Sequence, residues 1–393
     1  MKHRLAPAVA FVLAGALLHA SVLAHDSGLS NGLFRSRDGG ATWLQLDAGS
    51  FANGAQALAV HPTDAHRLLL ATDGGLLSSR NGGRDWEAEA SNVLSGPAFA
   101  VAFDLHGAEA MVSGANALYR FDGNRWTAMR TPAGSAPARV LVSGGVAGRA
   151  YLAGWAGLYR TDNWGRSWTR VGKEIDAEYV SALAISANSP NDIHALAGGR
   201  VWTSAGGARS WRVDEGIPQT ADALAFDRTV PTRLWIVAAG RAYRKQDGTS
   251  RWEPVGEPIP DPQAKARGID VLNDAMVIST DRGVFRSLNA GASWALLSAE
   301  LPSHVEATLL LRDPHTPATI YAGFSRMGPE QLKGVLLSPA QSFAPSEVAL
   351  PVAIYAGFAL FLVGVSVTVR RKSREGTATK ADRAIGEMGA KSR

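Results

Sequence analysis

The chain has 393 residues, of which 46% are hydrophobic and 19% charged, and it contains no cysteine. The absence of cysteine excludes a disulfide framework, thiolate metal sites, cysteine nucleophiles and a lipid-modified N-terminal cysteine. The formal net charge is +5, but the ends carry the excess: the 30 basic and 32 acidic residues of the central part, 25–369, give it a net charge of −2, which argues against nucleic-acid binding.

The first 24 residues have the features of a secretory signal. Lys2 and Arg4 form a basic start, residues 6–18 are apolar, and Ala24 ends a stretch that suits cleavage. We expect cleavage after residue 24, so that the mature chain begins near His25. An uncleaved N-terminal anchor is the alternative, and the apolar stretch is short for a membrane span.

Seven tryptophans then recur at intervals of 40 to 43 residues. They are Trp43, Trp86, Trp126, Trp168, Trp211, Trp252 and Trp294. A fixed period of this length, with short strand-like runs between the marks, is typical of the blades of a β-propeller.

Each repeat contains short apolar runs bounded by Gly, Pro, Asn and Asp, which indicate strands joined by tight turns. In chain order, expected strands cover 32–35, 57–60, 67–72, 75–77, 117–120, 157–160, 183–185, 193–196, 201–202, 224–226, 234–237, 242–244, 283–286, 308–311 and 320–322. With four strands A to D per repeat, the chain starts with a C–D pair and finishes with an A–B pair. We therefore predict an all-β domain over 25–340, a seven-bladed propeller of four-stranded blades closed by pairing of these two ends. Residues 334–338 resemble another C strand and compete for the same place.

A membrane anchor is predicted after the repeats. A linker at 341–347 leads to residues 348–369, which carry no charge and are long enough to cross a bilayer as a helix. Arg370, Arg371 and Lys372 follow at once, as expected at the cytoplasmic end of a span. The tail 370–393 would then be cytoplasmic, and the repeats would lie in the periplasm of a bacterium, held at the inner membrane.

The turn before the tryptophan carries the most specific motif, Ser/Thr-x-Asp-x-Gly-x-x-Trp. Its four good copies pair Asp38 with Trp43, Asn81 with Trp86, Asn163 with Trp168 and Asn289 with Trp294, whereas the copies before Trp126, Trp211 and Trp252 are degraded. An Asp or Asn side chain accepts backbone N–H bonds within its own turn, glycine supplies a positive φ, and the tryptophan buries its ring between sheets. These residues are therefore expected to be structural.

The motif resembles the Asp-box (BNR) repeat of sialidases, sortilin-type receptors, certain glucanases and the photosystem II stability/assembly factor family, over about residues 31–340. That resemblance implies a folding device placed away from the binding face. The arginine, tyrosine and glutamate set of a sialidase is not recognisable here, so no catalytic residue is predicted. In its domain organisation, a single exported propeller, the chain most resembles the assembly-factor family. That resemblance implies a non-enzymatic propeller that binds a membrane-protein partner. A sialidase-like glycoside hydrolase or a glycan-binding propeller is the alternative.

Arginines near successive B–C turns form the candidate binding site. Because B–C and D–A loops share one face of a propeller, the candidates Arg200, Arg241, Arg282 and Arg326 would form a basic arc able to bind carboxylate or phosphate. Ordinary solvated turn residues are the alternative. Trp155, in the corresponding turn of another repeat, would be an exposed anchor or would plug the channel. The sequence predicts no metal site and no cofactor.

Overall fold

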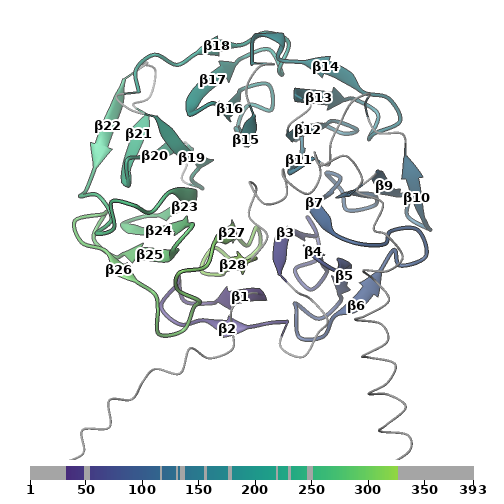
Figure 1. Ribbon diagram of the computed structural model, residues 1–393. Coiled ribbons are helices and arrows are strands. Elements are labelled where there is room, and N and C mark those ends of the chain that lie inside the picture. The colour runs from purple at the N-terminus through teal and green to yellow at the C-terminus, as the bar shows by residue number, and fades with distance from the viewer. Residues whose placement is uncertain are drawn as a thin grey trace, which may run out of the picture. The chain divides into compact units, whose positions relative to one another are not determined.

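Four antiparallel strands form the sheet of each repeat, and the structure contains seven such sheets. It is a computed structural model that describes residues 32–325 apart from 48–53, 116, 130–131, 133–137, 155–156, 176–178, 218–219, 229–231 and 246–250. Figure 1 shows the sheets side by side around a common centre, and the innermost strand of each contacts the innermost strands of its two neighbours. The prediction of a seven-bladed propeller of four-stranded blades is confirmed.

The four strands of each blade lie in order from an inner strand beside the central channel to an outer strand at the rim. The inner strands are β3 (Ala55–Val60), β7 (Ala98–Phe103), β11 (Val140–Ser143), β15 (Val180–Ile185), β19 (Ala221–Phe226), β23 (Ala266–Leu272) and β27 (Ala307–Arg312). The second strands are β4 (Leu68–Thr72), β8 (Ala110–Gly114), β12 (Ala150–Gly154), β16 (Ile193–Ala197), β20 (Leu234–Ala238), β24 (Ala275–Thr280) and β28 (Ile320–Phe324).

Shorter strands complete the blades towards the rim. The third strands are β1 (Gly32–Ser36), β5 (Gly75–Ser79), β9 (Leu118–Phe121), β13 (Gly157–Thr161), β17 (Arg200–Ser204), β21 (Arg241–Lys245) and β25 (Gly283–Ser287). The outer strands are β2 (Leu44–Gln45), β6 (Glu87–Glu89), β10 (Trp126–Met129), β14 (Thr169–Val171), β18 (Arg212–Val213), β22 (Trp252–Val255) and β26 (Ala295–Leu296). A 3-10 turn, η1 (Lys173–Ile175), follows β14. We number the blades 1 to 6 from β3–β6 to β23–β26.

The seventh blade joins the two ends of the repeat region. Its strand order is β2-β1-β28-β27, and β1 pairs with β28 from Gly32 opposite Phe324 to Ser36 opposite Ile320. The rings of Phe34 and Phe324 meet edge to face in this blade, with centroids 5.5 Å apart. The predicted closure of the ring by its own ends is therefore observed. The competing segment 334–338 lies outside the described residues.

Blades 2, 3 and 6 contain inner pairs that the strand prediction did not specify, and in blade 6 this pair is β23 and β24, joined at residues 273–274. Strands β7, β8, β11 and β12 are joined by turns at 104–109 and 144–149, which lack the prolines that mark the corresponding turn at His61. Without a proline to indicate a turn between strands, the alanine-rich and glycine-rich runs of blades 2 and 3 resemble loops in the sequence. Pairing with neighbouring strands nevertheless makes them regular sheet.

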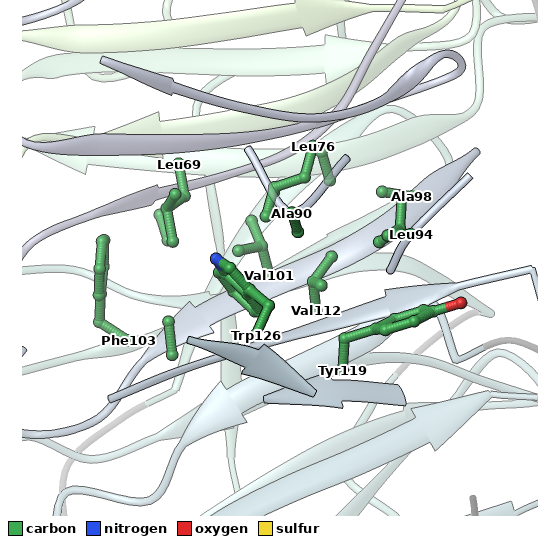
Figure 2. Close-up of a cluster of buried hydrophobic side chains, with 13 residues drawn as sticks. Leu69, Leu76, Ala90, Leu94, Ala98, Val101, Phe103, Val112, Tyr119 and Trp126 are labelled. Carbon is green, nitrogen blue, oxygen red and sulfur yellow. The ribbon is translucent and has the colours of Figure 1, made fainter. Parts of the chain in front are cut away.

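The core consists of clusters between blades, because each sheet buries side chains on both of its faces. Figure 2 shows the cluster between blades 1 and 2, where Leu69, Leu76 and Ala90 of blade 1 pack with Val112 and Trp126 of blade 2. Trp211 and Trp252 are buried in the same way against the preceding blades. Burial of a tryptophan ring between neighbouring sheets, as expected from the repeat, is observed at these positions.

Within the described ranges, no helix combines the length and the hydrophobicity needed to cross a bilayer. The predicted signal at 1–24, linker at 341–347, span at 348–369 and tail at 370–393 all lie outside these ranges.

Candidate functional site at the mouth of the channel

The antiparallel strands give the ring two different ends. The motif turns between third and outer strands lie beside the turns that join inner and second strands. Backbone hydrogen bonds connect the two sets, from Gly39 N to Ala318 O and from Gly82 N to His66 O, both at 2.8 Å. We call this the motif end. The opposite end, here called the mouth end, carries the starts of the inner strands and the turns between second and third strands.

At the motif end, Asp38 is committed to its own turn. Its carboxylate accepts hydrogen bonds from Ser36 Oγ at 2.7 Å, from the backbone N–H groups of Ala41 and Thr42 at 2.9 Å, and from Thr42 Oγ1 at 2.7 Å. Desolvation raises the pKa of Asp38, but the bonds from Thr42, Ser36 and Ala41 outweigh it and hold that pKa well below its usual value. A carboxylate stabilised in this charged form is a poor general acid.

The asparagines of the other three good copies make the same kind of turn. Each side-chain Oδ1 accepts a backbone N–H bond four residues on: Asn81 from Asp85, Asn163 from Ser167 and Asn289 from Ser293, at 2.8 to 2.9 Å. Trp86 and Trp294 donate their indole N–H groups to Leu46 O and Glu257 O of the preceding blades. Trp43 donates within its own turn, to Gly40 O at 3.1 Å, and Trp168 is partly buried against the cluster between blades 2 and 3.

The structure places the arginines Arg200, Arg241 and Arg282 at the mouth end of blades 4, 5 and 6. The Arg200 guanidinium lies 5.6 Å from the centroid of the Trp202 ring. Arg241 Nη2 bonds Glu257 Oε2 at 2.9 Å, and Arg282 Nη2 bonds Gln263 Oε1 at 2.7 Å with Asp261 3.8 Å away. The positive charge of the arc is thus partly balanced by neighbouring carboxylates. The other two candidates, Arg326 and Trp155, lie outside the described residues.

At the mouth end, the central channel opens into a cavity of about 350 Å³. Its polar lining includes one residue at or just before the start of the inner strand in each of six blades, Gln56, Arg139, Ser181, Asp222, Arg267 and Thr308, together with Tyr179, Thr220 and Glu306. We call the first six of these the mouth residues. They bring both signs of charge to one cavity from parts of the sequence that lie far apart.

A repeated irregularity of the backbone places these side chains. In β3, β15, β19, β23 and β27 the register shifts after the first residue, so that Gln56, Ser181, Asp222, Arg267 and Thr308 are each the extra residue of a β-bulge. In blade 3, Arg139 holds the same position, because its N–H bonds Ala153 O at 3.2 Å while Val140 is the register partner of Ala153. Bulges re-aim a side chain away from the regular alternation of a strand. Blade 2 has the same bulge at Phe99, which is buried instead.

The sequence analysis missed the mouth residues, although a signal for them exists. Each lies 11 to 15 residues after a motif tryptophan and follows a small apolar residue, as Gln56 follows Ala55 and Asp222 follows Ala221. Those small residues are buried, which fixes the start of each inner strand. The position in the repeat was visible in the sequence, but the bulge that turns it towards the channel was not.

A hydrogen-bond network holds Arg139 in the cavity. Gln56, only 4% exposed, accepts a bond on Oε1 from Arg139 Nη1 at 3.0 Å. The amide nitrogen of Gln56 donates to Asp73 and to Ser325 Oγ, and Ser325 Oγ donates in turn to Asp73 Oδ2 at 3.0 Å. Burial raises the pKa of Asp73, and the bonds from Gln56 and Ser325 offset part of that rise. The network spans blades 7, 1 and 3 and orients one guanidinium towards the channel.

The other cation of the mouth is held by a carboxylate of the next blade. Arg267 Nε bonds Glu306 Oε1 at 2.7 Å, and the side chain of Glu306 is 15% exposed. Asp222 lies on the neighbouring inner strand. Burial raises the pKa of Asp222, and the nearby charges of Arg267 and Lys265 counteract that rise, whereas Asp281 adds to it.

The fold is shared with known propellers. At 17% identity, the chain is similar to YCF48 bound to a D1 peptide, with a TM-score of 0.53 over 70% of this chain and 94% of that one. It is similar to YCF48 from Cyanidioschyzon merolae at 14% identity, with a TM-score of 0.54 over 73% of this chain and all of that one. The GH74 xyloglucanase from Xanthomonas campestris gives 20% identity and a TM-score of 0.52 over 69% of this chain and 51% of that one.

These likenesses establish the propeller architecture and no more, because the identities are low. No protein-family model and no curated protein matches the chain. In the part of the chain that the structure covers, no group of three or more His, Cys, Asp or Glu side chains is arranged to hold a metal ion. The arginines and carboxylates of the mouth end can bind and orient charged groups.

Proposed function

We propose that this chain is a non-enzymatic, membrane-anchored periplasmic propeller that binds a protein partner through its mouth end and assembles or stabilises a membrane-protein complex. The motif end serves to build the blades, which we assign to the Asp-box type. The partner would be a bacterial inner-membrane protein or a complex of such proteins.

The observation that supports this proposal most directly is that the polar side chains at the two ends of the ring differ in their role. The Asp and Asn side chains of the motif hydrogen-bond within their own turns, whereas the mouth end carries Arg200, Arg241 and Arg282 at the starts or just before the starts of third strands on three successive blades. Arginine forks suit the carboxylates and carbonyl groups of a peptide. The likeness to YCF48, which has been seen with a D1 peptide, agrees with a peptide-binding propeller.

Charge reversal of the arc tests this proposal. The tagged full-length chain is crosslinked in intact cells, and the membrane protein recovered with it is identified and quantified. Replacing Arg200, Arg241 and Arg282 together by Glu is expected to reduce recovery of that protein at least about tenfold, because three attractive charges become repulsive.

The matched control reverses three exposed arginines of the motif end, Arg84, Arg125 and Arg209. This triple variant should recover the partner as well as the unchanged chain does, provided both variants melt at the same temperature as the parent. Undiminished recovery with the arc variant, or equal losses with both variants, would remove the arc from the proposal.

A glycoside hydrolase or glycan-binding propeller is the second candidate, and one observation favours it. Asp222 and Glu306 are two carboxylates beside one cavity, as glycosidases require, and the pKa of Asp222 is raised by burial as that of a general acid would be. The ion pair of Glu306 with Arg267 fits a positioning role better than a catalytic one. Hydrolysis of xyloglucan or a sialoside by the purified chain, abolished by Asp222→Asn, would favour this candidate over the first.

A further inference from the structure

The mouth residues form a site of mixed charge inside the ring, separate from the arc. Arg139 belongs to blade 3 and Arg267 to blade 6, so their side chains reach the same cavity from well-separated blades. Asp222 of blade 5 lines that cavity too. The arginines of the arc, in contrast, are not among the residues that line it.

The two guanidinium groups keep donors available for a ligand. Arg139 bonds Gln56 through Nη1, and Arg267 bonds Glu306 through Nε. Among the described residues neither guanidinium makes a further hydrogen bond, so two nitrogens of each remain as possible donors. Gln56 and Glu306 are themselves mostly buried. Gln56 therefore fixes the orientation of Arg139, and Glu306 that of Arg267, before a ligand binds. Such a pair is suited to a carboxylate.

Asp222 supplies the opposite charge. It is half-buried and lies near the charges of Arg267 and Lys265, but in the described part of the chain no hydrogen bond or ion pair fixes its carboxylate. An ionised carboxylate that is partly removed from water gains most from a cationic hydrogen-bond donor. The bulge at this position presents Asp222 to the same cavity that receives the arginines.

The mouth cavity also has apolar lining. Tyr179, Ala182 and Ala221 line it beside the charged residues. A ligand held by the charges at the mouth would therefore also meet apolar surface within the same cavity.

We infer that the mouth residues bind a small zwitterion that has an apolar side chain, of the class of the aliphatic and aromatic α-amino acids. Its carboxylate would bind Arg139 and Arg267, its ammonium Asp222, and its side chain the apolar part of the cavity lining at Tyr179, Ala182 and Ala221. Balanced charge favours a zwitterion, because a purely anionic ligand would bring a second negative charge near Asp222 and a purely cationic one a further positive charge near Arg139 and Arg267. The cavity lies at the small end of the usual range for such sites, about 300–1,000 Å³. This inference goes beyond the proposed partner binding and does not depend on it.

Calorimetry with the full-length chain in mild detergent tests the charge requirements. Leucine and phenylalanine are the probes, with N-acetyl-leucine lacking the ammonium, leucine amide lacking the carboxylate, and glycine lacking the side chain. Leucine or phenylalanine should bind at least about tenfold more tightly than each of these three analogues. No binding of leucine or phenylalanine at millimolar concentration, or equal binding of leucine and its analogues, would overturn the inference whatever the variants do.

Two isosteric substitutions then assign each charge to a residue. Asp222→Asn should remove the preference for leucine over N-acetyl-leucine, and Arg139→Gln should remove the preference for leucine over leucine amide. Arg84→Gln, at the motif end, should alter neither. Retention of both preferences in the two mouth variants would contradict the assignment, even if leucine binds. Loss of partner recovery in the arc variant would leave these results unchanged, so the two proposals can fail separately.

Discussion

At the scale of single residues, one extra backbone position decides which side chains reach the channel. Successive side chains of a strand point to opposite faces, so a residue is re-aimed when a bulge breaks that alternation. Gln56, Asp222 and Arg267 occupy such positions, and the residue before each of them is a buried alanine. The bulge therefore allows the small residue to pack in the sheet while the polar residue faces the cavity.

Asp38 provides a stability prediction at the same scale. Asp38→Ala removes the acceptor of four hydrogen bonds and should lower the free energy of unfolding by about 1–2 kcal/mol at neutral pH. Asp38→Asn should be close to neutral there, because Asn163 and Asn289 make the equivalent turns. Urea unfolding of the three proteins at pH 7 measures both differences, and an Asn variant as unstable as the Ala variant would contradict this account.

The free energy of unfolding should depend on pH differently in the parent and in the Asp38→Asn variant. Because the pKa of Asp38 is lowered by folding, its stabilisation is complete above the unfolded-state value of 3.8 and is lost as the pH falls from there towards the folded-state pKa. The asparagine variant has no such group. The parent should thus lose stability relative to Asp38→Asn as urea unfolding is repeated at successively lower pH below about 4.

At the scale of elements, the closing blade is the one place where the two ends of the repeat region meet. Strand β1 supplies Phe34, which is 1% exposed and packs on Phe324 of β28, whereas β2 of the same hairpin carries Leu44, which is 62% exposed. Closure therefore depends on the buried face of β1, since β2 adds only two paired residues. The other six blades are formed by continuous segments and need no such joint.

Phe34→Ala should lower the free energy of unfolding by about 3–5 kcal/mol, because it opens a cavity at this joint. Leu44→Ala, in the same hairpin, should change it by no more than about 0.5 kcal/mol, since that side chain is already exposed. Chemical denaturation measures both values, and limited proteolysis should release the N-terminal hairpin first in the Phe34 variant. Equal effects of the two substitutions would show that closure does not depend on the phenylalanine contact.

At the scale of the whole propeller, the antiparallel strands place all motif turns at one end of the ring and the arc and the mouth residues at the other. The motif turns build the blades, whereas the arc and the mouth residues are the candidate binding sites. The two candidate sites at the mouth end differ in their electrostatics. The arc carries arginines near the surface of blades 4 to 6, whereas the mouth pairs both signs of charge within the cavity.

Salt should therefore separate the two sites. Raising the salt concentration from about 0.1 M to about 1 M shortens the screening length from about 10 Å to about 3 Å. Partner recovery through the arc should fall at least about tenfold, whereas leucine binding at the half-buried mouth should fall by less than about threefold. Parallel capture and calorimetry at the two salt concentrations make the comparison. A similar salt dependence of the two would argue against separate sites.

Much of the fold was predictable because its determinants are local and repeated. The spacing of the tryptophans indicates the blade period, and the C–D start and A–B finish of the chain predict the closing blade formed by β1 and β28. Turn chemistry at Asp38 and Asn289 is likewise contained within a few residues. The inner pairs of blades 2, 3 and 6 were missed because the turns between their two strands contain no proline.

The sequence by itself determined the architecture of this protein: the number of blades, the turns that build them and the face on which the arginines of successive repeats lie. Only the tertiary structure decided which residues share a site. Gln56 and Arg139 are 83 positions apart yet bond each other, Arg267 meets Glu306, and Arg241 is partly neutralised by Glu257. Period and turn chemistry act within a repeat, whereas the direction of a side chain at a bulge and its partner on another blade exist only once the ring has closed.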